Sequence, residues 1–166
     1  LTADALATLE VALEAFQAAR QREGRAMVEE MERLLESVET TLGTAATRAA
    51  ELPDAYRERL ETRIRELLEG TGVDPDPAQI VREAATLADR SDVREEIARL
   101  EAHLQHAREI LAEGGPVGRR LDFLVQEMHR EVNTIGTKAG DLAMARDGVA
   151  MTSAVARLRE QHQNLE

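Results

Sequence analysis

The sequence predicts an all-α protein of about five helices, two of them long, that pack as antiparallel hairpins or a bundle. Apolar residues recur at spacings of three and four along most of the chain, which is the period of an amphipathic helix. Aromatic residues make up 2% of the chain and charged residues 32%. This composition suits long helices that bury narrow stripes of Ala, Leu, Val and Ile, and we expect no sheet.

The first 70 residues are expected to form a long helical arm. A helix beginning at Thr2 or Asp4 carries two apolar seams: Leu6, Leu9, Leu13 and Phe16, then Met27, Met31, Leu34, Val38 and Leu42. We expect it to end at Leu52, because Pro53 cannot continue a regular helix. A helix of that length would span about 75 Å and must pair with something. Residues 54–68 should form a second helix that folds back as a hairpin or docks on another subunit.

Residues 71–77 are the clearest linker, and Asp76 followed by Pro77 is typical of a helix start. Residues 78–166 are expected to form a carboxyl-terminal helical domain. Its first helix either continues through Asp92 or restarts there, and a Gly-rich turn at 114–118 leads to the next helix. The final helix, 141–166, is expected to bury Leu142, Val149, Val155, Leu158 and Leu165.

Two helices carry polar side chains that could form a site. In residues 118–138 the row consists of Arg119, Asp122, Gln126, Arg130 and Asn133, with Glu127, Glu131 and Thr134 beside them. In the preceding helix, Glu96, Arg99, His103 and His106 follow one another at the same spacing, and we expect His106 to face solvent. Glu127 and Glu131 are four residues apart, so both carboxylates can face one metal ion. The plainer interpretation is a salt-bridged face packed against neighbouring helices.

Charge and composition exclude several classes of function. The formal net charge of −11 opposes indiscriminate binding to nucleic acid, although residues 117–139 hold four bases and three acids. The chain has no Cys, which excludes disulfides and zinc–thiolate sites and is consistent with a cytoplasmic location. No apolar run is long enough to span a membrane. The glycine spacing at 114–118 matches neither a P-loop nor a dinucleotide fingerprint.

Three ordered segments resemble one protein family. They are ADRSDVREEIARLEAH at 88–103, GRRLDFLVQEMHREVNTIGTK at 118–138 and REQHQNLE at 159–166, with a weaker match, QREG, at 21–24. These segments are similar to the YicC/YloC family of bacterial stress-associated proteins. The resemblance implies a divalent-metal-dependent endoribonuclease that acts on single-stranded RNA, with no DNA substrate expected, in a helical homo-oligomer, with a hexamer suggested. It also implies that the chain is a carboxyl-terminal fragment that lacks an amino-terminal domain.

The resemblance gives roles to particular side chains, all of them expectations at this stage. The expected ligands for Mn²⁺ or Mg²⁺ are Glu96, Asp122, Glu127 and Glu131. The expected contacts to RNA phosphate are Arg94, Arg99, Arg119, Arg120 and Lys138. The expected catalytic groups are His103, Glu127, Arg130 and Glu131, and the expected orienting groups are Gln126, Asn133 and Thr134.

The chain also departs from the family pattern near its end. Two acids of the family fall on Ala143 and Ala150, and its lysine falls on Thr152. If these groups belong to a site on one helix face, the chain is a weakened relative of the family's ribonucleases. The alternative function is a non-enzymatic helical module for oligomerisation, or an adaptor, whose polar rows make subunit contacts.

Overall fold

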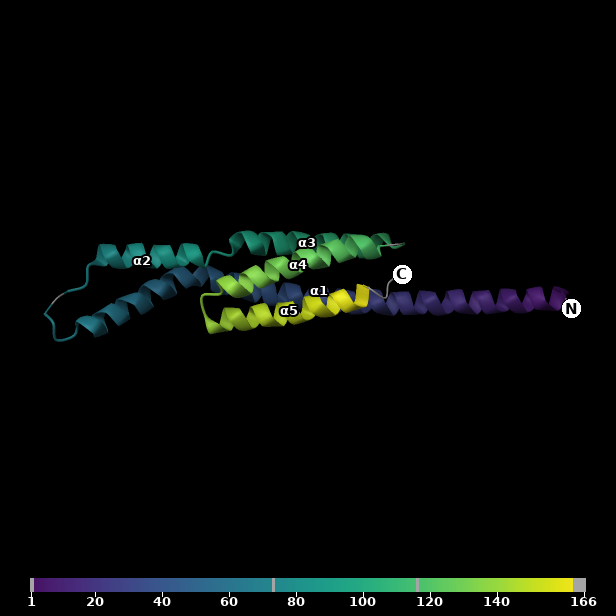
Figure 1. Cartoon of the computed structure of the whole chain (residues 1–166), viewed down its shortest axis with the longest axis horizontal. Coiled ribbons are helices and arrows are strands. Elements are labelled where there is room, and N and C mark those ends of the chain that lie inside the picture. Colours follow the sequence, from purple (N-terminus) through teal and green to yellow (C-terminus); the bar gives the residue numbers. More distant parts are fainter. Residues whose placement is uncertain (1, 73, 116, 163–166) are drawn as a thin grey trace.

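A computed structural model describes residues 2–72, 74–115 and 117–162. Within these residues it contains five α-helices, and the all-α prediction is confirmed. They are α1 (Thr2–Leu68), α2 (Pro77–Arg90), α3 (Arg94–Glu113), α4 (Gly118–Lys138) and α5 (Leu142–His162). Figure 1 shows a long, narrow molecule with a bundle in the middle and helical extensions at both ends. The final residues of the 159–166 segment, including Leu165, lie outside the described part.

The helix α1 does not end at Leu52, so this prediction was wrong. It continues through Pro53 to Leu68 as one element of 67 residues. A proline removes one backbone hydrogen bond and crowds the preceding turn, which can kink a helix without ending it. Figure 1 shows α1 changing direction near the colour of residue 50. Leu52 before the proline and Tyr56 after it both pack on the core, so tertiary packing holds the helix together across Pro53.

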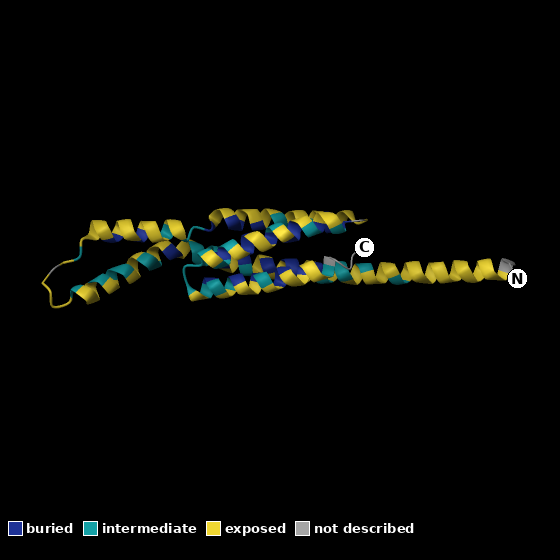
Figure 2. Cartoon of the chain, viewed as in Figure 1, coloured by how far each residue is buried: buried dark blue, intermediate teal, exposed yellow. Residues whose placement is uncertain are grey.

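The core is a four-helix bundle formed by the middle of α1 with α3, α4 and α5 (Figure 2). Figure 1 shows α4 antiparallel to both α3 and α5, and α5 antiparallel to α1. Methionines and leucines fill its centre, with Met31, Leu42, Leu104, Met128 and Met151 almost fully buried. The end of α1 instead pairs with α2 in a hairpin beyond the bundle, with the turn at residues 69–76.

The apolar stripe of α5 was predicted only in part. Val155 and Leu158 are buried, but Leu142 and Val149 are 68% and 71% exposed. The buried stripe begins instead at Met144 and continues through Met151. Residues two apart on a helix do not share a face, so Leu142 and Val149 point away from the stripe that Met144 and Met151 occupy.

Between α2 and α3 the chain restarts, which selects one of the two alternatives left open by the sequence. The Asp92 carboxylate accepts a hydrogen bond of 3.0 Å from the backbone N–H of Arg94. This satisfies one of the amides left without a partner at the start of α3. Asp76 caps α2 in the same way, accepting from the N–H of Ala78 at 2.9 Å.

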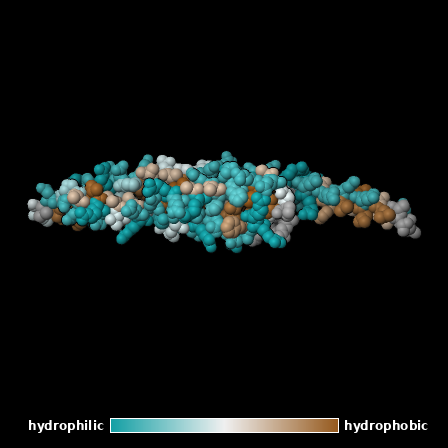
Figure 3. Space-filling view, turned by 90° about the horizontal axis from the view of Figure 1, so that it is seen from above, coloured by the Kyte–Doolittle hydropathy of each residue, from teal (hydrophilic) through white to brown (hydrophobic). Residues whose placement is uncertain are grey.

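The amino-terminal part of α1 extends beyond the bundle as an exposed arm. Its first predicted seam remains in solvent: Leu6, Leu9, Leu13 and Phe16 are 53–63% exposed. Figure 3 shows hydrophobic side chains gathered at this end of the molecule. The second seam begins at the half-buried Met27 and is buried against the bundle from Met31 onward.

The helices α4 and α5 approach each other most closely at a pair of glycines. A Cβ atom added to Gly148 would lie 2.9 Å from the Cα of Gly136. No real Cβ tolerates backbone at that distance, so the two helices would have to separate.

We therefore predict that Gly148→Ala lowers the free energy of unfolding by about 1–3 kcal/mol, because the overpacked crossing cannot close. The matched control is Gly43→Ala, also within a helix, where nothing lies within 4 Å of the added Cβ. The control should be neutral, or more stable by up to about 1 kcal/mol from helix propensity. Urea unfolding followed by far-ultraviolet circular dichroism measures both. Equal stability of the two variants would contradict the close crossing.

Candidate functional site

A network of charged side chains joins α3 to α4. Arg99 donates two hydrogen bonds to Glu131, from Nε to Oε1 at 2.8 Å and from Nη2 to Oε2 at 3.1 Å. Lys138 Nζ donates to Glu96 Oε1 at 2.9 Å and to the backbone carbonyl of Asp92 at 3.0 Å. The Arg99 guanidinium also lies 3.7 Å from Glu96. Four of the residues singled out from the sequence therefore meet between two helices.

Burial makes these pairings necessary. Among the side chains that the structure describes, Glu96 and Glu131 are the charged ones that are buried, with 5% and 7% exposure. Burial raises the pKa of Glu96, but the hydrogen bonds from Lys138 and from a backbone N–H outweigh it and hold the pKa below its usual range. The hydrogen bonds to Glu131 raise the pKa of Arg99. Each buried carboxylate is thus paired with a cation that is itself partly exposed.

The antiparallel pairing places two further predicted residues at one level. Arg99 reaches Glu131 from α3. His103 lies four residues after Arg99, and Glu127 lies four residues before Glu131. Because the helices run in opposite directions, His103 and Glu127 lie one turn further along the line of contact between α3 and α4, called the α3–α4 seam from here on. His103 is half-buried, whereas His106 is exposed as expected.

The remaining predicted residues have local partners. Glu127 accepts a hydrogen bond from Arg130 at 2.9 Å, and Asp122 accepts one from Gln126 at 2.8 Å. Arg120 is paired with Glu113, and Arg94 with Asp92. The hydrogen bonds from Arg94 lower the pKa of Asp92 to about 2. The Thr134 hydroxyl is bonded within its own helix, and Arg119 is exposed.

The four carboxylates proposed as metal ligands do not converge on one point. Within the described residues, no three Asp, Glu or His side chains form a group that could hold an ion. Asp122 is bonded to Gln126, whereas Glu96 of α3 is bonded to Lys138 of α4 and Glu131 of α4 is bonded to Arg99 of α3. A pair remains: Glu127 and Glu131, one helical turn apart on α4. Two carboxylates are a common protein contribution to a Mg²⁺ site in which phosphate oxygens and water supply the other ligands.

On the flank of α4 away from α3, α4 and α5 together form a groove with a volume of about 440 Å³. From α4 it is lined by Val125, Gln126, His129 and Arg130, and from α5 by Val155, Ala156, Arg159 and Glu160. The sequence had suggested roles for Gln126 and Arg130 but not for His129 or Arg159. The sequence did point to Arg159, because Arg159 and Glu160 begin the third segment that resembles the family. Only the packing of α5 on α4 shows that this segment lies beside the second one.

Comparison with known proteins decides the family. Residues 45–166 match the family model described as endoribonuclease YicC-like, C-terminal. The chain belongs to this family.

Two curated relatives agree with this assignment. A protein of Clostridioides difficile named probable endoribonuclease YicC is 33% identical over 147 residues, which cover 89% of this chain and 50% of that protein. A protein of Haemophilus influenzae with the same name is 33% identical over 166 residues, covering all of this chain and 56% of that protein. The chain thus spans about half the length of these YicC relatives.

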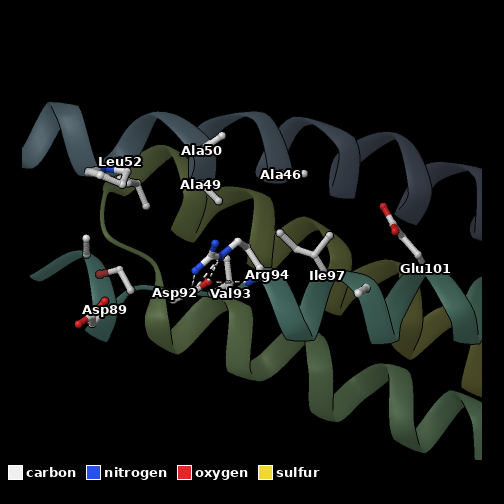
Figure 4. A pocket seen from close by; sticks show the side chains of 14 residues that line it. Ala46, Ala49, Ala50, Leu52, Asp89, Asp92, Val93, Arg94, Ile97 and Glu101 are labelled. Carbon is white, nitrogen blue, oxygen red and sulfur yellow. Dashed lines mark hydrogen bonds and ion pairs between the residues drawn. The ribbon is translucent and has the colours of Figure 1, made fainter. Parts of the chain in front are cut away.

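A second pocket lies at the junction of α1, α2 and α3 (Figure 4). Alanines of α1 and the apolar side chains Leu52, Val93 and Ile97 line it. The ion pair between Asp92 and Arg94 stands at its rim. Arg94 is the one predicted site residue that it contains, so this pocket is separate from the seam and groove that flank the YicC-like signature helix.

The three departures from the family pattern do not share one helix face, and that premise was wrong. Ala150 lines a pocket between α5 and α1 together with Leu34. Ala143, seven residues earlier, lies on the same flank as Ala150. Thr152 is two residues after Ala150 and therefore points elsewhere, with its hydroxyl bonded to the carbonyl of Gly148. The replaced acids and the replaced lysine of the YicC pattern therefore belong to different surfaces.

A search for membrane spans found none: over the described part of the chain, each helix is too short or too polar to cross a bilayer.

We predict that Lys138→Met lowers the free energy of unfolding by about 1–3 kcal/mol, because it leaves the buried Glu96 carboxylate without its cation. Adding Glu96→Gln should recover part of the loss. The control, Arg63→Met, removes an ion pair with Glu66 whose side chains are 72% and 59% exposed, and should cost at most about 1 kcal/mol. Chemical denaturation of the parent chain, Lys138→Met, Glu96→Gln and the double variant forms a double-mutant cycle, with Arg63→Met as the separate control. Equal losses in the single variant and the control would contradict the role given to the network.

Proposed function

We propose that this chain is the helical part of an endoribonuclease that cleaves single-stranded RNA with the help of Mg²⁺ or Mn²⁺. The observation that carries the proposal is the seam between α3 and α4, where Arg99 and Glu131 from two separate segments of the family resemblance are joined by two hydrogen bonds. The family membership and the printed names of the two relatives support the reaction class.

The roles follow from position along the seam. Glu127 and Glu131 would hold the ion, which when bound supplies a nucleophilic water and neutralises charge on the phosphate. His103, at the level of Glu127, is placed to carry a proton to or from the reacting oxygen. Arg99 and Lys138 hold the buried carboxylates in place through hydrogen bonds. The exposed guanidinium of Arg119 is available to attract RNA phosphate.

The test combines metal binding with cleavage. We expect Mn²⁺ binding, measured by calorimetry, to weaken by about tenfold or more in Glu127→Gln, because one of two carboxylate ligands is lost. The matched control is Glu101→Gln, which removes an equal charge from an exposed position on α3. Cleavage of end-labelled single-stranded RNA should require Mn²⁺, stop on addition of EDTA and fall in Glu127→Gln and His103→Ala.

Either of two results would contradict the proposal. One is Mn²⁺ affinity that is the same in Glu127→Gln, Glu101→Gln and the parent chain. The other is RNA cleavage that continues in EDTA with unchanged rate in His103→Ala. Since cleavage can also depend on parts found only in the longer relatives, the calorimetric result stands as an independent measurement.

A second function, self-assembly through the arm of α1, is favoured by one specific observation. Leu6, Leu9, Leu13 and Phe16 form an apolar stripe that the described part of the chain does not cover. An exposed stripe of this kind marks a surface that a partner helix can bury.

We predict that light scattering at micromolar concentrations gives a mass above the 18.3 kDa of one chain. Leu9→Asp combined with Leu13→Asp should reduce the mass to that of one chain, because burying an unpaired charge in an apolar seam is costly. Leu67→Asp, at an exposed apolar position outside the arm, should leave the mass unchanged. A single-chain mass for the parent protein would refute the assembly.

A further inference from the structure

The groove between α4 and α5 lies outside the proposed cleavage seam, yet its chemistry is that of a nucleotide site. Its lining includes two arginines, Arg130 from α4 and Arg159 from α5, against one acid, Glu160. Arg130 is also bonded to Glu127 at 2.9 Å, so the groove is locally close to neutral in a chain of net charge −11. Both arginines are exposed and come from different helices, so they can approach a phosphate from two sides.

The floor of the groove is apolar. Val125 and Val155 are buried and lie beneath it, and Ala156 forms part of the wall. A nucleobase needs an apolar surface below it and a flat cationic or aromatic group beside it. Arginine guanidinium planes and the imidazole of His129 can serve where Trp is absent and Phe and Tyr are few.

The polar groups at the rim have defined hydrogen-bonding roles. The side-chain amide nitrogen of Asn133 lies 3.0 Å from Nδ1 of His129. With the amide nitrogen donating to Nδ1, Nε2 is the ring nitrogen of His129 left to meet a ligand. Gln126 donates its amide to Asp122 at 2.8 Å, which leaves its carbonyl oxygen as an acceptor. Gln126 and His129 are three residues apart on α4 and so are neighbours on one helix face, where both can meet the edge of one base.

We infer that the α4–α5 groove binds one nucleotide of a single-stranded RNA, with the base over Val125 and Val155 and its phosphate between Arg130 and Arg159. The inference rests on the proposed function for the identity of the ligand. It extends that function by adding a contact site on the flank of α4 opposite to the seam with α3. A strand held here crosses the exposed face of α4, where Arg119 and Arg130 lie, before reaching Glu127.

The test measures RNA binding without metal, so that it does not depend on cleavage. A fluorescein-labelled oligouridylate is titrated in EDTA and followed by anisotropy. Arg159→Ala should weaken binding about tenfold, since one charge-assisted phosphate contact is lost. The matched control is Arg146→Ala, which removes the same charge from an exposed position on α5 outside the groove and should weaken binding far less. His129→Ala should weaken binding, whereas Mn²⁺ affinity should stay unchanged in both groove variants.

A second measurement locates the RNA directly. Oligonucleotides containing 4-thiouridine should cross-link on irradiation to residues 125–130 or 155–160. Equal losses in Arg159→Ala and Arg146→Ala would mean that only overall charge matters, and the groove would be rejected. Cross-links confined to α2 or the arm of α1 would also reject it. If Glu127→Gln leaves Mn²⁺ binding unchanged but Arg159→Ala weakens RNA binding, the groove binds RNA and the proposed cleavage function is wrong.

Discussion

Two carboxylates buried between α3 and α4 constrain the rest of the structure. Glu96 is bonded to Lys138 and Glu131 to Arg99 across the two helices, and these pairings fix the register of α3 against α4. A shift of α4 by one turn would separate both pairs. The register in turn brings His103 level with Glu127 and orients the other flank of α4 toward α5. An interaction that adds little net stability can thus select one arrangement among many available to helices with similar leucine stripes.

The sequence was most informative where a residue's role depends on its neighbours along the helix. The helix start at Asp76 and Pro77 follows from local rules and was predicted, and the restart at Asp92 was one of the two alternatives that the sequence left open. The path through Pro53 was not, because packing on both sides of the proline outweighs its local cost. On α5 the sequence offered apolar residues on two faces, and only the partner helices decide which face is buried.

The candidate site shows the same division. Spacing alone put Glu127 and Glu131 on one flank of α4, but it could not show that Arg99 already occupies Glu131 or that Asp122 is bonded to Gln126. Nor could it bring Arg159 beside Gln126, since the two are joined by packing of separate helices. The period of a single helix does not predict which side chains of two different helices meet. A site for RNA would depend on side chains of that kind.

The pairing of α1 with α5 joins segments that are far apart in the sequence. Arg48 is bonded to Asp147, and Glu30 to Arg157, across 99 and 127 residues. The hairpin of α3 and α4 needs only a short turn, so it can form early, whereas closing α1 onto α5 requires ordering most of the chain. During synthesis the leucines of the stripe from Met31 to Leu42 therefore stay exposed to solvent until α5 has been made and packs on them. For that interval the stripe is open to a chaperone or to premature association.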